Sequence, residues 1–122
     1  MSDLTLNFLG INTTNFDEML RFYTEVMKLE VKHSKPGWVA FQTIGIKLEL
    51  FSVDKITNPI STKNPAQAPN FIGFETKDIE QSLNWMKSKN VSIVEDIATH
   101  SWGIDFYITD PDANLIQIAQ YT

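Results

Sequence analysis

The sequence contains no cysteine, and this absence excludes several kinds of chemistry. Disulfide frameworks, thiolate metal sites and cysteine nucleophiles all require a thiol. Only two histidines are present, and there is no glycine-rich phosphate loop, GxSxG elbow, HExxH pair or EF-hand loop. Nucleophilic catalysis therefore has little support in this chain.

Long apolar runs and massed basic residues are also missing. No apolar run approaches the roughly 20 residues that cross a bilayer, and the start "MSDLTLNFLG" lacks the basic and apolar regions of a signal peptide. We therefore expect a cytoplasmic protein that makes no membrane contact. The ten Lys and Arg residues are scattered among 15 Asp and Glu, for a net charge of -5, which disfavours nucleic acid as a partner. An acidic surface favours neutral or cationic small molecules, or serves solubility alone.

The 122 residues, 43% of them hydrophobic, suit a single domain that spans residues 1–122. Within it, "NFLGI" at residues 7–11 returns as "NFIGF" at residues 70–74, and the likeness continues through "NFLGINTTNFDEML" and "NFIGFETKDIEQSL". We therefore divide the chain into two repeated modules, 4–53 and 70–122. The stretch between them, 54–69, is rich in proline and polar residues and is predicted to be a linker.

Each module is predicted to begin with a short strand and a helix. Residues alternate along each strand, so one face is expected to pack against the helix. The opposite face is then free to contact a ligand or another part of the protein. Capping-box spacing then predicts helix starts at Asn15 with Glu18 and at Asp78 with Gln81. Apolar stripes at helical spacing follow in both modules: Met19, Leu20, Tyr23, Val26 and Met27 in the first, and Ile79, Leu83 and Met86 in the second.

Three further strands follow each predicted helix. They cover residues 29–34, 38–44 and 46–52 in the first module, and 92–97, 104–109 and 115–120 in the second. Each module thus reads as strand, helix, strand, strand, strand. This order predicts an α+β fold of two βαβββ modules, in which both sheets line a shared hollow and each helix covers the other face of its sheet.

Several segments, in order, resemble one known family. They are "NFDEMLRFYTEVMKLEV" and "KLELF" in the first module and "WGIDFYITDPDANLIQIAQ" in the second. Together they resemble the vicinal oxygen chelate superfamily, which includes glyoxalase I, extradiol dioxygenases, fosfomycin-resistance enzymes and bleomycin-resistance proteins. The resemblance covers essentially the whole chain and implies paired βαβββ modules, whose curved mixed sheets enclose a cleft, in a homodimer. "PGWVAFQTIGIKLELF" is most similar to the metal-lacking bleomycin-resistance branch.

The resemblance also implies four metal-ligand positions, two in each module. In this sequence they fall on Phe8, Glu49, Phe71 and Gln117. Phenylalanine has no lone pair to offer, and two oxygen ligands alone make a weak site. We therefore expect no metal and no other cofactor. The alternative is a divalent metal held by Glu49 with a relocated ligand set.

Glu49 and Gln117 are the polar candidates for the site. Glu49 alternates with leucines in "IKLELFS", so it should face the cleft and could accept a proton, grip a ligand or serve structure only. It is the one candidate catalytic residue. Gln117 lies equivalently in "LIQIAQ" and offers a donor and an acceptor, although a neutral amide is a poor base.

Aromatic and glycine residues complete the predicted ligand-binding set. Trp38 and Trp102 follow the loop breaks in both modules, and with the two phenylalanines they either line a cleft that stacks planar or cationic ligands or fill the hollow. Gly10 and Gly73 share the strand faces of Phe8 and Phe71. They mark room for a ligand or close backbone packing.

The two histidines and one turn are further features of the sequence. His33 and His100 lie near predicted strand ends, where an exposed histidine is the usual outcome, although a relocated metal site that uses them stays open. In "DPDAN", Ala113 stands where the family has glycine. If that position needs a positive φ, alanine costs roughly 1 kcal/mol relative to glycine.

These observations lead to one functional hypothesis and two alternatives. The chain is predicted to bind a small hydrophobic or aromatic molecule, neutral or cationic, in an aromatic-lined cleft and without turnover. The first alternative is a metal-dependent lyase, isomerase or dioxygenase that uses Glu49, with His33, His100 or Gln117 as further ligands. The second is a subunit or scaffold whose cleft is packed shut.

Overall fold

The computed structural model describes residues 3–57 and 64–122. The chain divides into two compact units, Met1–Asn58 and Pro59–Thr122. Part of the predicted linker, residues 58–63, lies outside the described residues. Its last part forms a turn, in which the backbone oxygen of Asn64 accepts the amides of Gln67 and Ala68 at 2.9 and 3.0 Å.

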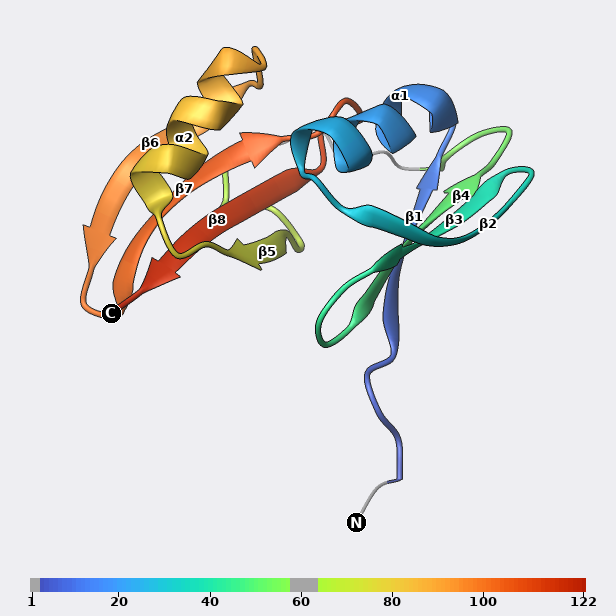
Figure 1. Ribbon diagram of the computed structural model, residues 1–122, viewed down its shortest axis with the longest axis horizontal. Helices are drawn as coiled ribbons and strands as arrows, with labels where there is room; N and C mark the ends of the chain where they lie inside the picture. The colour runs from blue at the N-terminus through green and yellow to red at the C-terminus, as the bar shows by residue number, and fades with distance from the viewer. Residues whose placement is uncertain (1–2, 58–63) are drawn as a thin grey trace. The chain divides into compact units, whose positions relative to one another are not determined.

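The first module contains one helical segment and four strands (Figure 1). They are β1 (Phe8–Thr13), α1 (Phe16–Arg21), the π-helix η1 (Phe22–Val26), β2 (Glu30–Lys35), β3 (Trp38–Gln42) and β4 (Lys47–Ser52). The sheet order is β1-β4-β3-β2, with β1 parallel to β4 and the other neighbours antiparallel.

The second module repeats this plan (Figure 1). Its elements are β5 (Ile72–Glu75), α2 (Ile79–Ser88), β6 (Ile93–His100), β7 (Gly103–Thr109) and β8 (Leu115–Tyr121). The sheet order β5-β8-β7-β6 matches that of the first module, with β5 parallel to β8. The prediction of an α+β fold built from two βαβββ modules is confirmed. Among the described residues, no helix is both long enough and apolar enough to cross a membrane.

The core of the first module lies between its sheet and its helical segment. Every second residue of its strands faces the helix and is buried. These residues are Ile11, Thr13, Val39, Phe41, Leu48 and Leu50. Met19 and Tyr23 of the predicted stripe are fully buried against them. Phe22 is also buried, which the helical spacing did not predict. The π-turn, in which the amide of Met27 bonds to Phe22 oxygen at 3.0 Å, shifts the register so that neighbours 22 and 23 both point inward.

The second module buries the predicted stripe of α2, and Ile79, Leu83 and Met86 pack against Phe106, Ile108, Ile116 and Ile118. Asp78 caps this helix as predicted, since its carboxylate accepts the Gln81 amide at 3.1 Å. The side chain of Gln120 in β8 accepts the Ile79 amide at 2.8 Å and ties the helix start to the sheet. The helix start predicted at Asn15 is confirmed, but its side chain donates to Glu18 at 3.2 Å and accepts no backbone amide.

Two turns in the second module depend on unusual backbone angles. Gly103 has φ of 151°, and an added Cβ would collide with the backbone oxygen of Gln120. Ala113 has φ of 67°, so the "DPDAN" turn keeps the left-handed conformation that favours glycine. The buried Asp110 holds this turn, because its carboxylate accepts the backbone amides of Asp112 and Asn114, each at 2.9 Å.

Candidate functional site

The candidate residues lie on the sheet faces opposite the helices. In the first module, strand register places Gly10 beside Glu49, and Glu49 beside Ala40 of β3. We call this surface the first-module face, defined by Phe8, Gly10, Trp38, Glu49 and Phe51. In the second module, register places Gln117 between Gly73 of β5 and Tyr107 of β7. The second-module face is defined by Phe71, Gly73, His100, Trp102, Asp105, Tyr107 and Gln117.

Glu49 is held by an indole on the neighbouring strand. Its leucine neighbours Leu48 and Leu50 are buried on the helix side, so the predicted outward orientation of Glu49 is confirmed. The Trp38 indole donates from Nε1 to Oε1 of Glu49 at 2.8 Å, and both side chains are half-buried. This charge-assisted bond fixes the carboxylate and leaves its second oxygen for another donor.

Gly10 makes room for two phenylalanine rings. The rings of Phe8 and Phe51 lie 6.5 Å apart at 47°. A Cβ built on Gly10 would lie 3.3 Å from Phe51 Cε2 and 3.4 Å from Phe8 Cε2. Close packing of its own neighbours therefore explains this glycine. Phe51 was missed in the sequence, although its alternation with Leu50 places it on this face.

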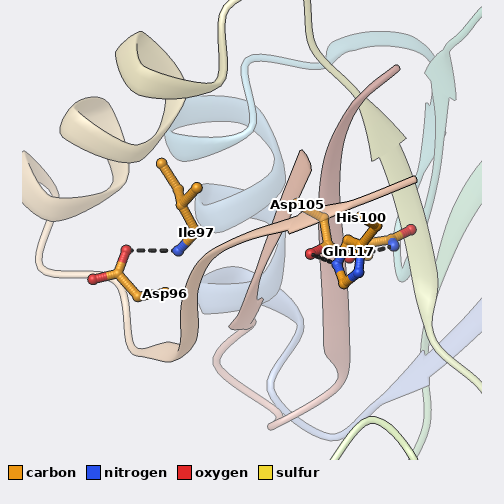
Figure 2. A network of polar contacts seen from close by, with 5 residues as sticks. All are labelled: Asp96, Ile97, His100, Asp105 and Gln117. Atoms are coloured by element: carbon orange, nitrogen blue, oxygen red, sulfur yellow. Dashed lines mark hydrogen bonds and ion pairs between the residues drawn. The ribbon is translucent and has the colours of Figure 1, made fainter. Parts of the chain in front are cut away.

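A buried carboxylate organises the second-module face (Figure 2). Asp105 is only 4% exposed. Its Oδ1 lies 2.8 Å from His100 Nε2, and its Oδ2 accepts from Gln117 Nε2 at 2.9 Å. Three strands, β6, β7 and β8, thus each supply one member of the network. Asp105 was not singled out from the sequence, although "IDFYIT" alternates and places it on the side away from Ile104 and Phe106.

Aromatic rings continue this network toward the end of the sheet. The His100 and Trp102 rings stack at 4.9 Å with 9° between their planes. Trp102 also contacts Tyr121, with ring centroids 5.5 Å apart. His100 was predicted to be a surface histidine, and its side chain is 39% exposed, but it is held by a carboxylate and an indole. It therefore has a fixed orientation.

Phe71 and Tyr107 form an edge-to-face pair on the same surface, with centroids 5.6 Å apart at 77°. Burial raises the pKa of Tyr107, and the negative charges of Asp105 and then Glu95 raise it further, while a hydrogen bond with Gln117 opposes them. The phenol therefore keeps its proton to a higher pH than a free tyrosine does. A Cβ built on Gly73 would lie 3.4 Å from Gln117 Oε1.

The donor set does not fit the four-ligand metal centre that the family resemblance implies. Phe8 and Phe71 carry no donor atom, Glu49 is bonded to an indole, and Gln117 is bonded to Asp105. His33 lies within β2 and so belongs to a different module from His100. Across residues 3–57 and 64–122, no three His, Asp or Glu side chains gather in a group that could hold a metal ion.

Comparison with protein families identifies the chain. The model of the Glyoxalase/Bleomycin resistance protein/Dioxygenase superfamily matches residues 5–118, a range that includes both modules. The chain belongs to this superfamily. A comparison with curated proteins yielded no match.

Solved structures of the superfamily fold are similar along the whole chain. A glyoxalase/bleomycin resistance protein/dioxygenase from Nocardioides is 16% identical over 99% of this chain and 85% of its own, with a TM-score of 0.77. An antibiotic-binding protein from a Streptomyces species is 19% identical over 100% and 99%, with a TM-score of 0.74. A virulence protein from Salmonella typhimurium is 25% identical over 100% of both chains, with a TM-score of 0.75. The first two likenesses show the fold alone.

Proposed function

We propose that this superfamily member binds a small hydrophobic or aromatic molecule, neutral or cationic, on the aromatic faces of its sheets and without the usual metal centre. The proposal rests mainly on Phe8 and Phe71, which occupy two of the four positions where the family resemblance implies metal ligands. Each of these side chains stays 44% exposed. Trp102 is 39% exposed on the second-module face. Exposed aromatic rings around a few fixed polar groups are typical of small-molecule sites.

The exposed rings offer a useful binding energy. A phenylalanine side chain has roughly 200 Å² of surface, so 44% exposure leaves roughly 90 Å² of each ring open to solvent. At about 25 cal/mol per Å², covering one ring contributes about 2 kcal/mol. The bonded Glu49 side chain on the first-module face, or the bonded Gln117 side chain on the second-module face, would then set the orientation of a ligand on that face, a role that needs no turnover.

We expect the protein to act as a homodimer in the cytoplasm, as the family resemblance suggests. The similar fold of an antibiotic-binding protein supports a ligand of comparable type, a small organic molecule. It gives no identity for the ligand of this chain.

A thermal-shift screen with a library of aromatic and cationic compounds tests the proposal. A compound present at about 100 times its Kd stabilises the folded protein by about 2.7 kcal/mol and raises the Tm. The Phe71→Ala variant should lose this response if the ligand lies on the second-module face, and Phe8→Ala should lose it if the ligand lies on the first-module face. Val31→Ala is the matched control, because Val31 is 45% exposed but faces the helix side of β2. A library without any compound that raises the Tm, or hits that survive both Phe71→Ala and Phe8→Ala unchanged, would refute the proposal.

A further inference from the structure

We propose that His100 is the proton acceptor of the second-module face, and that the ligand is a planar molecule with a weakly acidic hydroxyl group, such as a phenol or an enol. The inference rests on the proposed binding function and adds the chemical group that is recognised. In the complex, the ligand hydroxyl gives its proton to His100 Nδ1. The O–H bond breaks with its electron pair left on oxygen, the N–H bond forms, and no other reactant is needed.

The hydrogen-bond network defines which nitrogen is available. A carboxylate only accepts hydrogen bonds, so Oδ1 of Asp105 requires a proton on His100 Nε2. The other oxygen, Oδ2, already accepts from Gln117. A neutral His100 therefore carries its lone pair on Nδ1.

Ring orientation makes that lone pair accessible. In an imidazole the two nitrogens point to opposite sides of the ring, so Nδ1 of His100 points away from Asp105. The parallel stack on Trp102 fixes the plane of the ring. In the part of the chain that the structure describes, the bond to Asp105 is the only side-chain hydrogen bond of His100, and the side chain is 39% exposed. Figure 2 shows the imidazole ring of His100 beside the Asp105 carboxylate, with their hydrogen bond as a dashed line.

The charges around His100 select a neutral, acidic ligand over an anion. The titratable groups on the same sheet face as His100 come from all four strands: Glu75 of β5, Glu95 of β6, Asp105 and Tyr107 of β7, and Tyr121 of β8. Asp96 bonds at 2.7 Å to the Ile97 amide of its own strand (Figure 2). These strands contain no lysine or arginine. A preformed anion would meet carboxylates, whereas a neutral hydroxyl becomes an anion only beside the new imidazolium.

Two probes that differ in one proton test the inference. They are 4-nitrophenol and its methyl ether, 4-nitroanisole, titrated into the full chain at a pH below the pKa of the free phenol and above about 6.5, the ordinary pKa of histidine, so that imidazole and phenol both start neutral. We expect the phenol to bind about tenfold more tightly, the size of one charge-assisted hydrogen bond, and to show the visible absorption of its phenolate when bound. In His100→Gln both advantages should disappear. The matched control His33→Gln should keep them, because His33 lies in the first module.

A second measurement avoids any variant. Nitrogen-15 NMR of the histidine rings should show His100 as the Nε2–H tautomer in the free protein. The ring should become doubly protonated with 4-nitrophenol and stay unchanged with 4-nitroanisole. An Nδ1–H tautomer, or equal binding of both probes, would overturn the inference and leave the proposed function standing. If neither probe nor any library compound binds, the proposed function fails and this inference fails with it.

Discussion

Replacing Ala113 by glycine should make the protein more stable, against the usual effect of adding a glycine. Ala113 lies in the "DPDAN" turn with φ of 67°, and its amide bonds to the backbone oxygen of Asp110 at 2.9 Å. A left-handed conformation costs a residue with a Cβ roughly 1–2 kcal/mol, and glycine avoids this cost. Asp110 holds the turn from both sides, so the strand connection cannot relax to avoid the strain.

The net gain is smaller than the strain, because glycine also gives the unfolded chain more freedom. That entropic term is about 0.4–1 kcal/mol, which leaves a stabilisation of about 0.5–1 kcal/mol. For a chain of 122 residues, about 1 kcal/mol corresponds to a Tm increase of roughly 3–5 °C.

Urea unfolding followed by circular dichroism measures this difference directly. The matched control is Ala98→Gly, the same substitution within β6, which should lose about 0.5–1 kcal/mol because a strand gains nothing from positive φ. Ala113→Gly that lowers the free energy of unfolding by as much as the control would refute the strain reasoning.

Three further predictions follow from individual contacts, and a fourth concerns the oligomeric state. Trp38→Phe should cost about 1–2 kcal/mol of unfolding free energy, since it leaves the Glu49 carboxylate without its donor; an unchanged urea midpoint would argue against that bond. Gly103→Ala should lower the Tm by several degrees, because its Cβ would collide with Gln120, and a neutral result would contradict the geometry. Stability should fall as the pH rises above about 10, because the raised pKa keeps Tyr107 protonated in the folded state while the unfolded phenol ionises. Tyr107→Phe should remove part of this loss, and an unaltered alkaline profile would count against it. Light scattering should give twice the 13.9 kDa chain mass if the homodimer proposal holds, and a monomer would reject it.

The order of elements and the helix-facing core could be predicted because both are repeated, periodic features. Period-two alternation assigned Leu48 and Leu50 to the core and Glu49 to the other face, and the structure confirms this. The same reasoning was available for Phe51 and Asp105, but alternation gives only the face of a side chain. It does not tell which polar partner lies on the next strand.

The contacts that define the second-module face depend on tertiary structure. His100 and Asp105 are five residues apart, and they meet because β6 and β7 are paired across a turn whose Gly103 accepts an unusual φ. Sequence spacing alone favoured an exposed histidine. Two local features are likewise not anticipated by average helix rules. They are the π-turn that buries Phe22 and the Asn15 side chain, which accepts no backbone amide at the helix start.

The most direct test of binding without a metal is isothermal titration calorimetry with the strongest hit of the thermal-shift screen. The protein would first be treated with a chelator, and the titration would be run with and without added divalent metal. We predict saturable binding with the same Kd in both titrations, because phenylalanines, Phe8 and Phe71, occupy two of the four metal-ligand positions and cannot bind a metal. Binding that appears only after a metal is added, and that is lost in Glu49→Ala, would contradict the proposed function and favour the metal-dependent enzyme.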